Sequence, residues 1–357
     1  MSKQHNPTPR SLITPTDDEK YDRIIADSLP QIPSRGGPET PSDDGTETET
    51  ISGDGTIADP HSCVGEDGRT YQGYMPGEYM LPNDRAEQHR LDFSHALYRL
   101  MLDNELAAAP LREPEHALDI GTGTGIWALQ FAEENPTCQV TGTDLSLIQP
   151  LSWMPNCQFV MENSESQDWL FPHKFDYIHL RGMTACFNDV KTVMRRALQG
   201  LTAGGWVEFQ EGCFNPHGVP DDDALEGTAL GRWCRLVAAG AAKCGRDLTK
   251  ARLYKQQLTE TGFVDVHERV IHVPGSPWPK DRKAKLLGVY FANMLCMGAI
   301  DSFKQLLAAA GELSSSEMDE LREKVKEDVQ NPEICWYMPM YVVYGRKPYD
   351  GEVGGTG

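Results

Sequence analysis

The chain has few basic residues and no Cys-x-x-Cys pair, and each absence excludes a class of protein. Its 33 Lys and Arg residues face 53 Asp and Glu residues, so the formal net charge at pH 7 is −20. A nucleic-acid surface needs clustered Lys and Arg to neutralise phosphates, so we expect no nucleic-acid partner. The nine cysteines stand singly, which predicts free thiols in a reducing compartment. We also expect no bound metal.

A long apolar run is also missing. The stretch over 286–300 is interrupted by Asn293. It is too short to cross a bilayer, so it predicts a buried helix and no membrane contact. Residues 1–10 are polar and do not resemble a signal peptide. We therefore expect a cytoplasmic protein, with the nucleus as the alternative compartment.

Composition divides the chain into a polar leader, a folded domain and a short tail. Between Pro38 and Pro60 there are acidic residues but no Lys or Arg. Such a segment buries too little apolar area to offset its ordering entropy, so we predict a disordered acidic leader over 1–67 and a disordered tail over 348–357. The folded domain is expected over 68–347, as an N-terminal cap (68–110), a cofactor-binding core (111–212), a mainly helical substrate region (213–333) and a final strand (334–347).

Short strands alternate with helices in the core. Strands are predicted at 117–120, 138–143, 157–161, 175–180 and 206–210. Helices are predicted between them at 126–134 and 190–201, and apolar spacing predicts another over 83–102, capped by Asn83 or Asp84. Two later strands, at 263–272 and 334–345, surround a helical insert. The pattern indicates a Rossmann-like α/β fold: a seven-stranded, mostly parallel sheet with helices on both faces and an antiparallel edge.

A glycine-rich turn follows the first core strand, in the sequence Leu118-Asp119-Ile120-Gly121-Thr122-Gly123-Thr124-Gly125-Ile126. Glycines let the backbone pass close to a ligand, and the N-terminus of the following helix offers free N–H groups. A dinucleotide fingerprint would need glycine at position 126, where isoleucine stands. The spacing G-x-G-x-G after an aspartate is instead typical of methyltransferases that bind S-adenosyl-L-methionine.

Acidic and polar residues follow the other strands at the places where such a cofactor needs partners. Asp119 is expected to receive the methionyl ammonium, and Asp144 to accept hydrogen bonds from both ribose hydroxyls. Glu162 and Asn163 are expected beside the adenine, and Arg181 near the methionine end. The remaining cofactor contacts are expected from Tyr79, Gly121, Thr122, Gly123, Gly125 and Leu145.

Methyl transfer is an in-line displacement at a carbon that the sulfonium already activates. The enzyme aligns the nucleophile, excludes water and, for a hydroxyl or amine acceptor, removes a proton. Candidate bases are His95, His179 and Glu211, with His217 as a further one. Each also has a structural interpretation: the histidines as hydrogen-bonded supports and Glu211 as a solvated loop residue. Substrate choice is expected from Trp233, Trp278, Tyr290 and Met294 in the helical insert.

Over roughly 68–347 the sequence resembles the fungal LaeA-like methyltransferases. The most specific segment is Asp144-Leu145-Ser146 followed by Ile148-Gln149-Pro150. Other matching segments are Tyr79 to Asp84, Arg90-Leu91-Asp92 with His95, Leu118 to Trp127, Phe175 to His179, Gly204-Gly205-Trp206, Gly262-Phe263, Pro277-Trp278-Pro279 and Tyr344 to Lys347. The resemblance implies a class I fold with S-adenosyl-L-methionine as cofactor. Thr122 stands where the family's global regulator has cysteine, which is too mild a departure to distinguish the roles within the family.

Three hypotheses follow from these observations. The favoured one is an O- or N-methyltransferase that acts on a small molecule of fungal secondary metabolism. The second is a regulator of secondary metabolism that binds the cofactor and acts through protein partners, for which the acidic leader is available. The third is a dinucleotide-dependent oxidoreductase, which nicotinamide binding would reveal.

Overall fold

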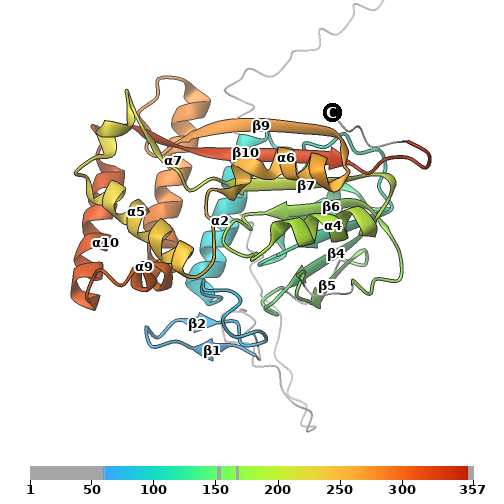
Figure 1. The fold of residues 1–357 in the computed structure, drawn as a ribbon, viewed down its shortest axis with the longest axis horizontal. Coiled ribbons are helices and arrows are strands. Elements are labelled where there is room, and N and C mark those ends of the chain that lie inside the picture. Colours follow the sequence, from blue (N-terminus) through green and yellow to red (C-terminus); the bar gives the residue numbers. More distant parts are fainter. Residues whose placement is uncertain (1–58, 60, 151–153, 166–168, 353–357) are drawn as a thin grey trace, which may run out of the picture.

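A twisted, mostly parallel sheet forms the centre of the computed structural model, which describes residues 59, 61–150, 154–165 and 169–352. The strand order is β5-β4-β3-β6-β7-β10-β8, and β9 also pairs with β10 (Figure 1). The parallel strands are β3 (His116–Ile120), β4 (Gln139–Asp144), β5 (Cys157–Met161), β6 (Phe175–Arg181) and β7 (Leu201–Gly212). This arrangement confirms the predicted Rossmann-like α/β fold. The sheet has eight strands and not the expected seven, because the short β8 (His217–Gly218) joins it.

The antiparallel strand lies inside the sheet, which corrects the expected antiparallel edge. β10 (Trp336–Arg346) pairs with β7 on one side and with β9 (Val264–Pro274) on the other, so β9 is the edge. The two-residue β8 (His217–Gly218) pairs with the start of β10. The physical reason is burial: both faces of β10 are apolar, whereas β9 exposes polar residues such as His267 and Glu268, as edge strands do.

Helices cover both faces of the sheet. α2 (Arg85–Met101) and α3 (Ile126–Glu134) lie on one face, and α4 (Val190–Gly200) and α6 (Tyr254–Thr261) pack together on the other. The predicted bounds of α3 are correct, and Asp84 caps α2 by accepting a hydrogen bond from the Glu87 N–H at 3.0 Å. α6 ends at Gly262, which adopts the left-handed conformation (φ 110°) that favours glycine.

The helical insert gathers at one end of the sheet, at the left of Figure 1. Its elements are η1 (Asp222–Leu225), α5 (Ala229–Lys243), η2 (Lys250–Leu253), α7 (Arg282–Met294), the π-helical η3 (Leu295–Ala299), α8 (Ile300–Ser302), α9 (Lys304–Ala310) and α10 (Ser315–Gln330). The run Arg282–Ser302 is long and apolar enough to cross a membrane by length and composition, but half of the apolar window is buried inside the protein. Since Leu287, Phe291 and Leu295 belong to the core, this segment is the buried helix that the sequence predicts.

Ordered structure extends beyond the predicted folded domain at both ends. β1 (Cys63–Val64) pairs with β2 (Thr70–Tyr71), so part of the expected leader forms a hairpin; residues 1–58 and 60 lie outside the described part of the chain. In the expected tail, Glu352 pairs with Arg346 at 2.9 Å because β10 ends beside it. Residues 353–357 lie outside the description, and no disulfide joins any of the nine cysteines, all of which are described.

A buried carboxylate fastens the chain before β3 to the sheet. Glu208, on β7, is fully buried and accepts hydrogen bonds from the backbone N–H groups of Ala108 and Ala109 at 2.8–3.0 Å. The Gln210 amide donates a further hydrogen bond to it at 2.8 Å. Removing this side chain would leave several buried donors without an acceptor, which costs more than the hydrogen bonds themselves contribute.

We therefore expect Glu208→Ala to lower the free energy of unfolding by about 3 kcal/mol, and Glu208→Gln, which keeps one acceptor oxygen, by about half of that. Urea denaturation followed by circular dichroism measures both values. Glu133→Ala is the matched control, because Glu133 is exposed on α3 and its loss should change stability by less than about 0.5 kcal/mol. Equal stability of the Glu208→Ala and Glu133→Ala variants would contradict the supporting role.

Candidate functional site

The glycine turn after β3 needs glycine at three positions. Gly121, Gly123 and Gly125 have φ values of 68°, 57° and 80°, in the region that side chains with a Cβ atom rarely adopt. A Cβ atom at Gly125 would also lie 2.5 Å from the Phe159 ring. Gly125 is the N-cap residue of α3, so the turn leads directly into the helix.

Asp144 at the end of β4 holds this turn in place. Its carboxylate accepts hydrogen bonds from the backbone N–H of Gly123 at 2.8 Å and of Ser146 at 3.0 Å. Burial raises the pKa of Asp144 to about 6, although these hydrogen bonds act in the opposite direction. The carboxylate lines a cavity of about 110 Å³, which we call the Asp144 cavity. Leu145, Glu162 and Asn163 line it too, so the structure brings together the residues expected around ribose and adenine.

Asp119 at the end of β3 lies between two side-chain donors. His179 Nδ1 contacts one carboxylate oxygen at 2.7 Å, and the Thr122 hydroxyl donates to the other at 2.6 Å. The carboxylate must accept both hydrogen bonds, so the His179 proton is on Nδ1. Each oxygen keeps a further lone pair, and Asp119 lines a second cavity of about 220 Å³. We call this second space the Arg90 cavity, after another residue of its wall.

His95 is not free to act as a base, which corrects one expectation. Its Nε2 lies 2.9 Å from the Gln130 side-chain oxygen, and its Nδ1 lies 3.0 Å from Arg181 Nη2. A guanidinium can only donate, so Nδ1 accepts from Arg181 and Nε2 carries the proton. Burial, followed by the charge of Arg181, lowers the pKa of His95 well below its usual value. The ring is therefore neutral and uses both of its nitrogens to hold its neighbours.

Glu211 is a buried strand residue, which corrects the expectation of a solvated loop. It accepts hydrogen bonds from the Met183 backbone N–H at 3.0 Å and the Thr184 hydroxyl at 2.7 Å, and so shapes the loop after β6. Burial raises the pKa of Glu211 to about 7. The Glu211 side chain lines neither cavity. His217 on β8 contacts Asp222 and does not line either cavity.

The two cavities meet at the glycine turn and at the end of β6. Six residues line both of them: Tyr79, Leu91, Gly121, Gly123, Arg181 and Gly182. Thr122, Asp119 and His179 line only the Arg90 cavity, and Gly125 lines neither, since it caps α3. The junction therefore joins the expected ribose and adenine partners to the expected methionine partners.

Of the four insert residues expected to choose the substrate, only Met294 lines the Arg90 cavity. Trp233 is buried in the core of the insert, Trp278 Nε1 donates to the Trp336 carbonyl, and Tyr290 stacks on Phe93. The insert instead contributes neighbours of Met294 that the sequence analysis missed: Phe291, Leu295, Ala299, Ser302 and Phe303. The sequence shows the apolar helical pattern of this segment, but it does not specify which face of the helix lines the cavity.

The donors and acceptors of the two cavities fit S-adenosylmethionine. The Asp144 carboxylate would hold the ribose hydroxyls, and Glu162 and Asn163 would lie beside the adenine. Beside the junction, in the Arg90 cavity, Asp119 would hold the methionyl ammonium. Arg181 would hold the carboxylate of the cofactor's methionyl group, since among the described residues nothing accepts hydrogen bonds from the Nε and Nη1 atoms of Arg181. When bound, this cofactor supplies a methyl group on a sulfonium, which the junction would present to the Arg90 cavity.

Comparisons with known proteins agree with this geometry. Residues 93–268 match the sequence profile of a methyltransferase domain family. Methyltransferase pytC of Aspergillus terreus is 34% identical over 292 residues, which are 79% of this chain and 87% of that protein. The secondary metabolism regulator laeA of Aspergillus fumigatus is 31% identical over 296 residues, 81% of this chain and 78% of the regulator. The protein-methionine methyltransferase laeA of Emericella nidulans is 30% identical over 287 residues, 79% of this chain and 76% of that enzyme.

The sheet, the glycine turn and the acidic residue after β4 define a class I methyltransferase that uses S-adenosylmethionine. Within this class, the chain belongs to the fungal LaeA-like methyltransferase family. Membership decides against the dinucleotide-dependent oxidoreductase that the glycine turn alone left open. The methyl acceptor is a small molecule or a protein.

Cofactor affinity should depend on pH through Asp144. Because its pKa is raised to about 6, the carboxylate that would accept from the ribose is lost as the pH falls below that value. We expect the affinity for S-adenosylhomocysteine to rise about tenfold from pH 5 to pH 7 and then to level off. Isothermal titration calorimetry across this range measures it. Asp144→Asn should bind more weakly and without this rise, and a wild-type affinity that is flat from pH 5 to 7 would contradict the assignment.

Proposed function

We propose that this enzyme methylates an oxygen or nitrogen of a small, largely apolar molecule that binds in the Arg90 cavity. The observation that carries the proposal is the junction of the two cavities, which would place the cofactor's methyl group beside the Arg90 cavity. The apolar part of its wall is formed by Leu81, Leu97, Phe214, Phe291, Met294, Leu295, Met338 and Met340. Such a wall with a few convergent polar groups is typical of a small-molecule site.

His179 is the one of the three expected bases that lines this cavity. It stacks on Trp127 with 3.8 Å between ring centroids, and its Nδ1–H is bound by Asp119. Its Nε2 therefore carries the free lone pair, and no described residue hydrogen-bonds to that atom. That atom is itself buried and the ring is 0% exposed, so an acceptor in the cavity does not reach it. We propose that His179 orients the Asp119 carboxylate, and that an acceptor which is already nucleophilic needs no side-chain base. Alignment and exclusion of water remain the larger contributions, because the sulfonium already activates the methyl carbon.

The names of the relatives support a role in fungal secondary metabolism, as a biosynthetic enzyme or as a regulator that acts through protein partners. One relative is named a protein-methionine methyltransferase, and one observation favours a methionine acceptor here. The Met183 side chain lines the Asp144 cavity, and its sulfur is the nearest atom to a Cβ built on Gly121. A methionine thioether is thus the second candidate acceptor. Intact-mass spectrometry after incubation with the cofactor separates the two, since self-methylation adds one methyl mass to wild type but not to Met183→Leu.

Filling the Arg90 cavity should stop turnover and spare cofactor binding. We expect Ala299→Phe, which places a ring in the cavity from η3, to lower the rate of S-adenosylhomocysteine release with phenolic and amine acceptors by more than about tenfold. The affinity for S-adenosylhomocysteine should stay within about twofold of wild type, because Ala299 does not line the Asp144 cavity.

The matched control is Met297→Phe, on the same π-helical segment, where the side chain is 55% exposed. This variant should keep both turnover and affinity. Wild-type turnover in the Ala299→Phe variant would contradict the assignment of the cavity. Absence of turnover in wild type with every small acceptor, together with a methylated Met183, would favour the second candidate.

A further inference from the structure

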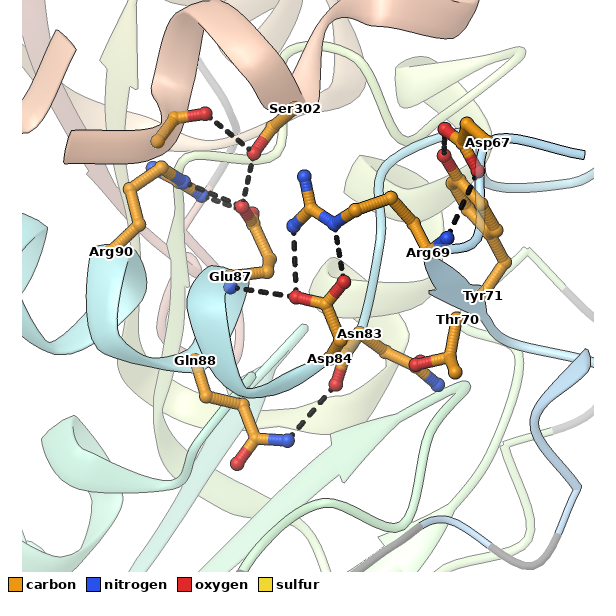
Figure 2. Close-up of polar contacts among 11 residues, drawn as sticks. Asp67, Arg69, Thr70, Tyr71, Asn83, Asp84, Glu87, Gln88, Arg90 and Ser302 are labelled. Atoms are coloured by element: carbon orange, nitrogen blue, oxygen red, sulfur yellow. Dashed lines mark hydrogen bonds and ion pairs between the residues drawn. The ribbon is translucent and has the colours of Figure 1, made fainter. Parts of the chain in front are cut away.

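Arg90 is held in one orientation by a carboxylate on its own helix. Its Nε donates to one oxygen of Glu87 at 2.9 Å, and its Nη2 donates to the other. Glu87 is 1% exposed and also accepts a hydrogen bond from the hydroxyl of Ser302, at the end of α8 (Figure 2). The same hydroxyl lies 2.9 Å from the Gly298 carbonyl oxygen, so its single proton is shared between the two acceptors. The pair is therefore fixed between α2 and the helical insert, which are far apart in the sequence.

The stem of Arg90 is fixed by packing. A Cβ atom at Gly298 would lie 3.5–3.7 Å from Cβ, Cγ and Cδ of Arg90, which is an ordinary packing distance, so the stem of Arg90 lies directly beside η3. Gly298 belongs to η3, a π-helical segment, and such segments are frequent at functional sites. Helix packing and hydrogen bonding therefore restrain the same arginine from two sides.

One nitrogen of this guanidinium remains for a ligand. Glu87 takes Nε and Nη2, and among the described residues none accepts a hydrogen bond from Nη1. Arg90 lines the Arg90 cavity but not the Asp144 cavity, so it faces the proposed acceptor and not the ribose or adenine.

The charge of the pair limits what Nη1 can bind. Glu87 already neutralises Arg90, so a carboxylate in the ligand would add a negative charge without a counter-charge from this pair, in a buried place where such charges are costly. A neutral oxygen avoids that cost and satisfies the N–H groups, which are strong donors because they belong to a cation. A purely apolar ligand would leave them without an acceptor.

We propose that Arg90 determines acceptor specificity by donating from Nη1 to a neutral carbonyl or ether oxygen on an otherwise apolar methyl acceptor. Glu87 and Ser302 are positioning residues, which hold the guanidinium in the orientation that this contact needs. The proposal rests on the proposed function, since it assigns a ligand contact within the same cavity.

The experiment compares two probes by calorimetry with protein saturated by S-adenosylhomocysteine. The probes are 4-hydroxyacetophenone and 4-ethylphenol, which differ by one carbonyl oxygen. We expect wild type to bind the ketone about tenfold more tightly, as one charge-assisted hydrogen bond implies. The variant Arg90→Met keeps the stem but leaves Glu87 unpaired, so the double variant Glu87→Gln/Arg90→Met is measured beside it. In the double variant the preference should fall to about twofold or less.

Ser94→Ala is the matched control, because Ser94 lines the same cavity one turn along α2. It should keep the preference, and all variants should keep wild-type affinity for S-adenosylhomocysteine. Two outcomes overturn the role of Arg90 and leave the proposed function in place. One is a preference for the ketone that survives in the double variant, and the other is the absence of this preference in wild type while both probes bind. Tighter binding of 4-hydroxybenzoate than of the ketone overturns the neutral oxygen. Failure of both probes to bind to saturated wild type overturns the small-molecule cavity itself, and this inference with it.

Discussion

The hydrogen bond from the Gly123 N–H to the Asp144 carboxylate is the contact on which the site depends. It joins the turn after β3 to the end of the neighbouring strand β4, so the start of α3 and the walls of both cavities follow from its geometry. The bond requires glycine, because φ at Gly123 is positive. The bond also offsets part of the desolvation of the buried carboxylate. The pKa of Asp144 is nevertheless raised, so the desolvation is the larger effect.

The same physical device recurs through the sheet. Glu208 and Glu211 on β7 and Glu87 on α2 are buried carboxylates, and each one accepts hydrogen bonds from another segment of the chain. Burying a carboxylate is tolerable only when donors surround it, and a fully partnered carboxylate then fixes the position of its neighbours. Glu211 and His95 are therefore best understood as supports that position the loop after β6 and Arg181, although their residue types suggest catalysis.

The sequence predicts the cofactor half of the site well because its signals are local. The strand, glycine turn and helix of 116–134 form one continuous segment, and its period and spacing specify the structure without help from the rest of the chain. The acceptor half depends on contacts between distant residues, such as Glu87 with Ser302. Burial is likewise a property of the assembled sheet, which is why Glu211 was expected in a loop and the antiparallel strand at the edge.

The π-helical segment shows why acceptor specificity is harder to derive than cofactor binding. The stretch over 286–300 was expected as one buried helix, but η3 has wider turns than an α-helix, and within it Leu295 and Ala299 line the cavity while Gly298 does not. A change in this segment would alter the acceptor wall and leave the glycine turn intact. Relatives with one cofactor site can therefore differ in acceptor, and the contact between α2 and η3 is where such a difference would arise.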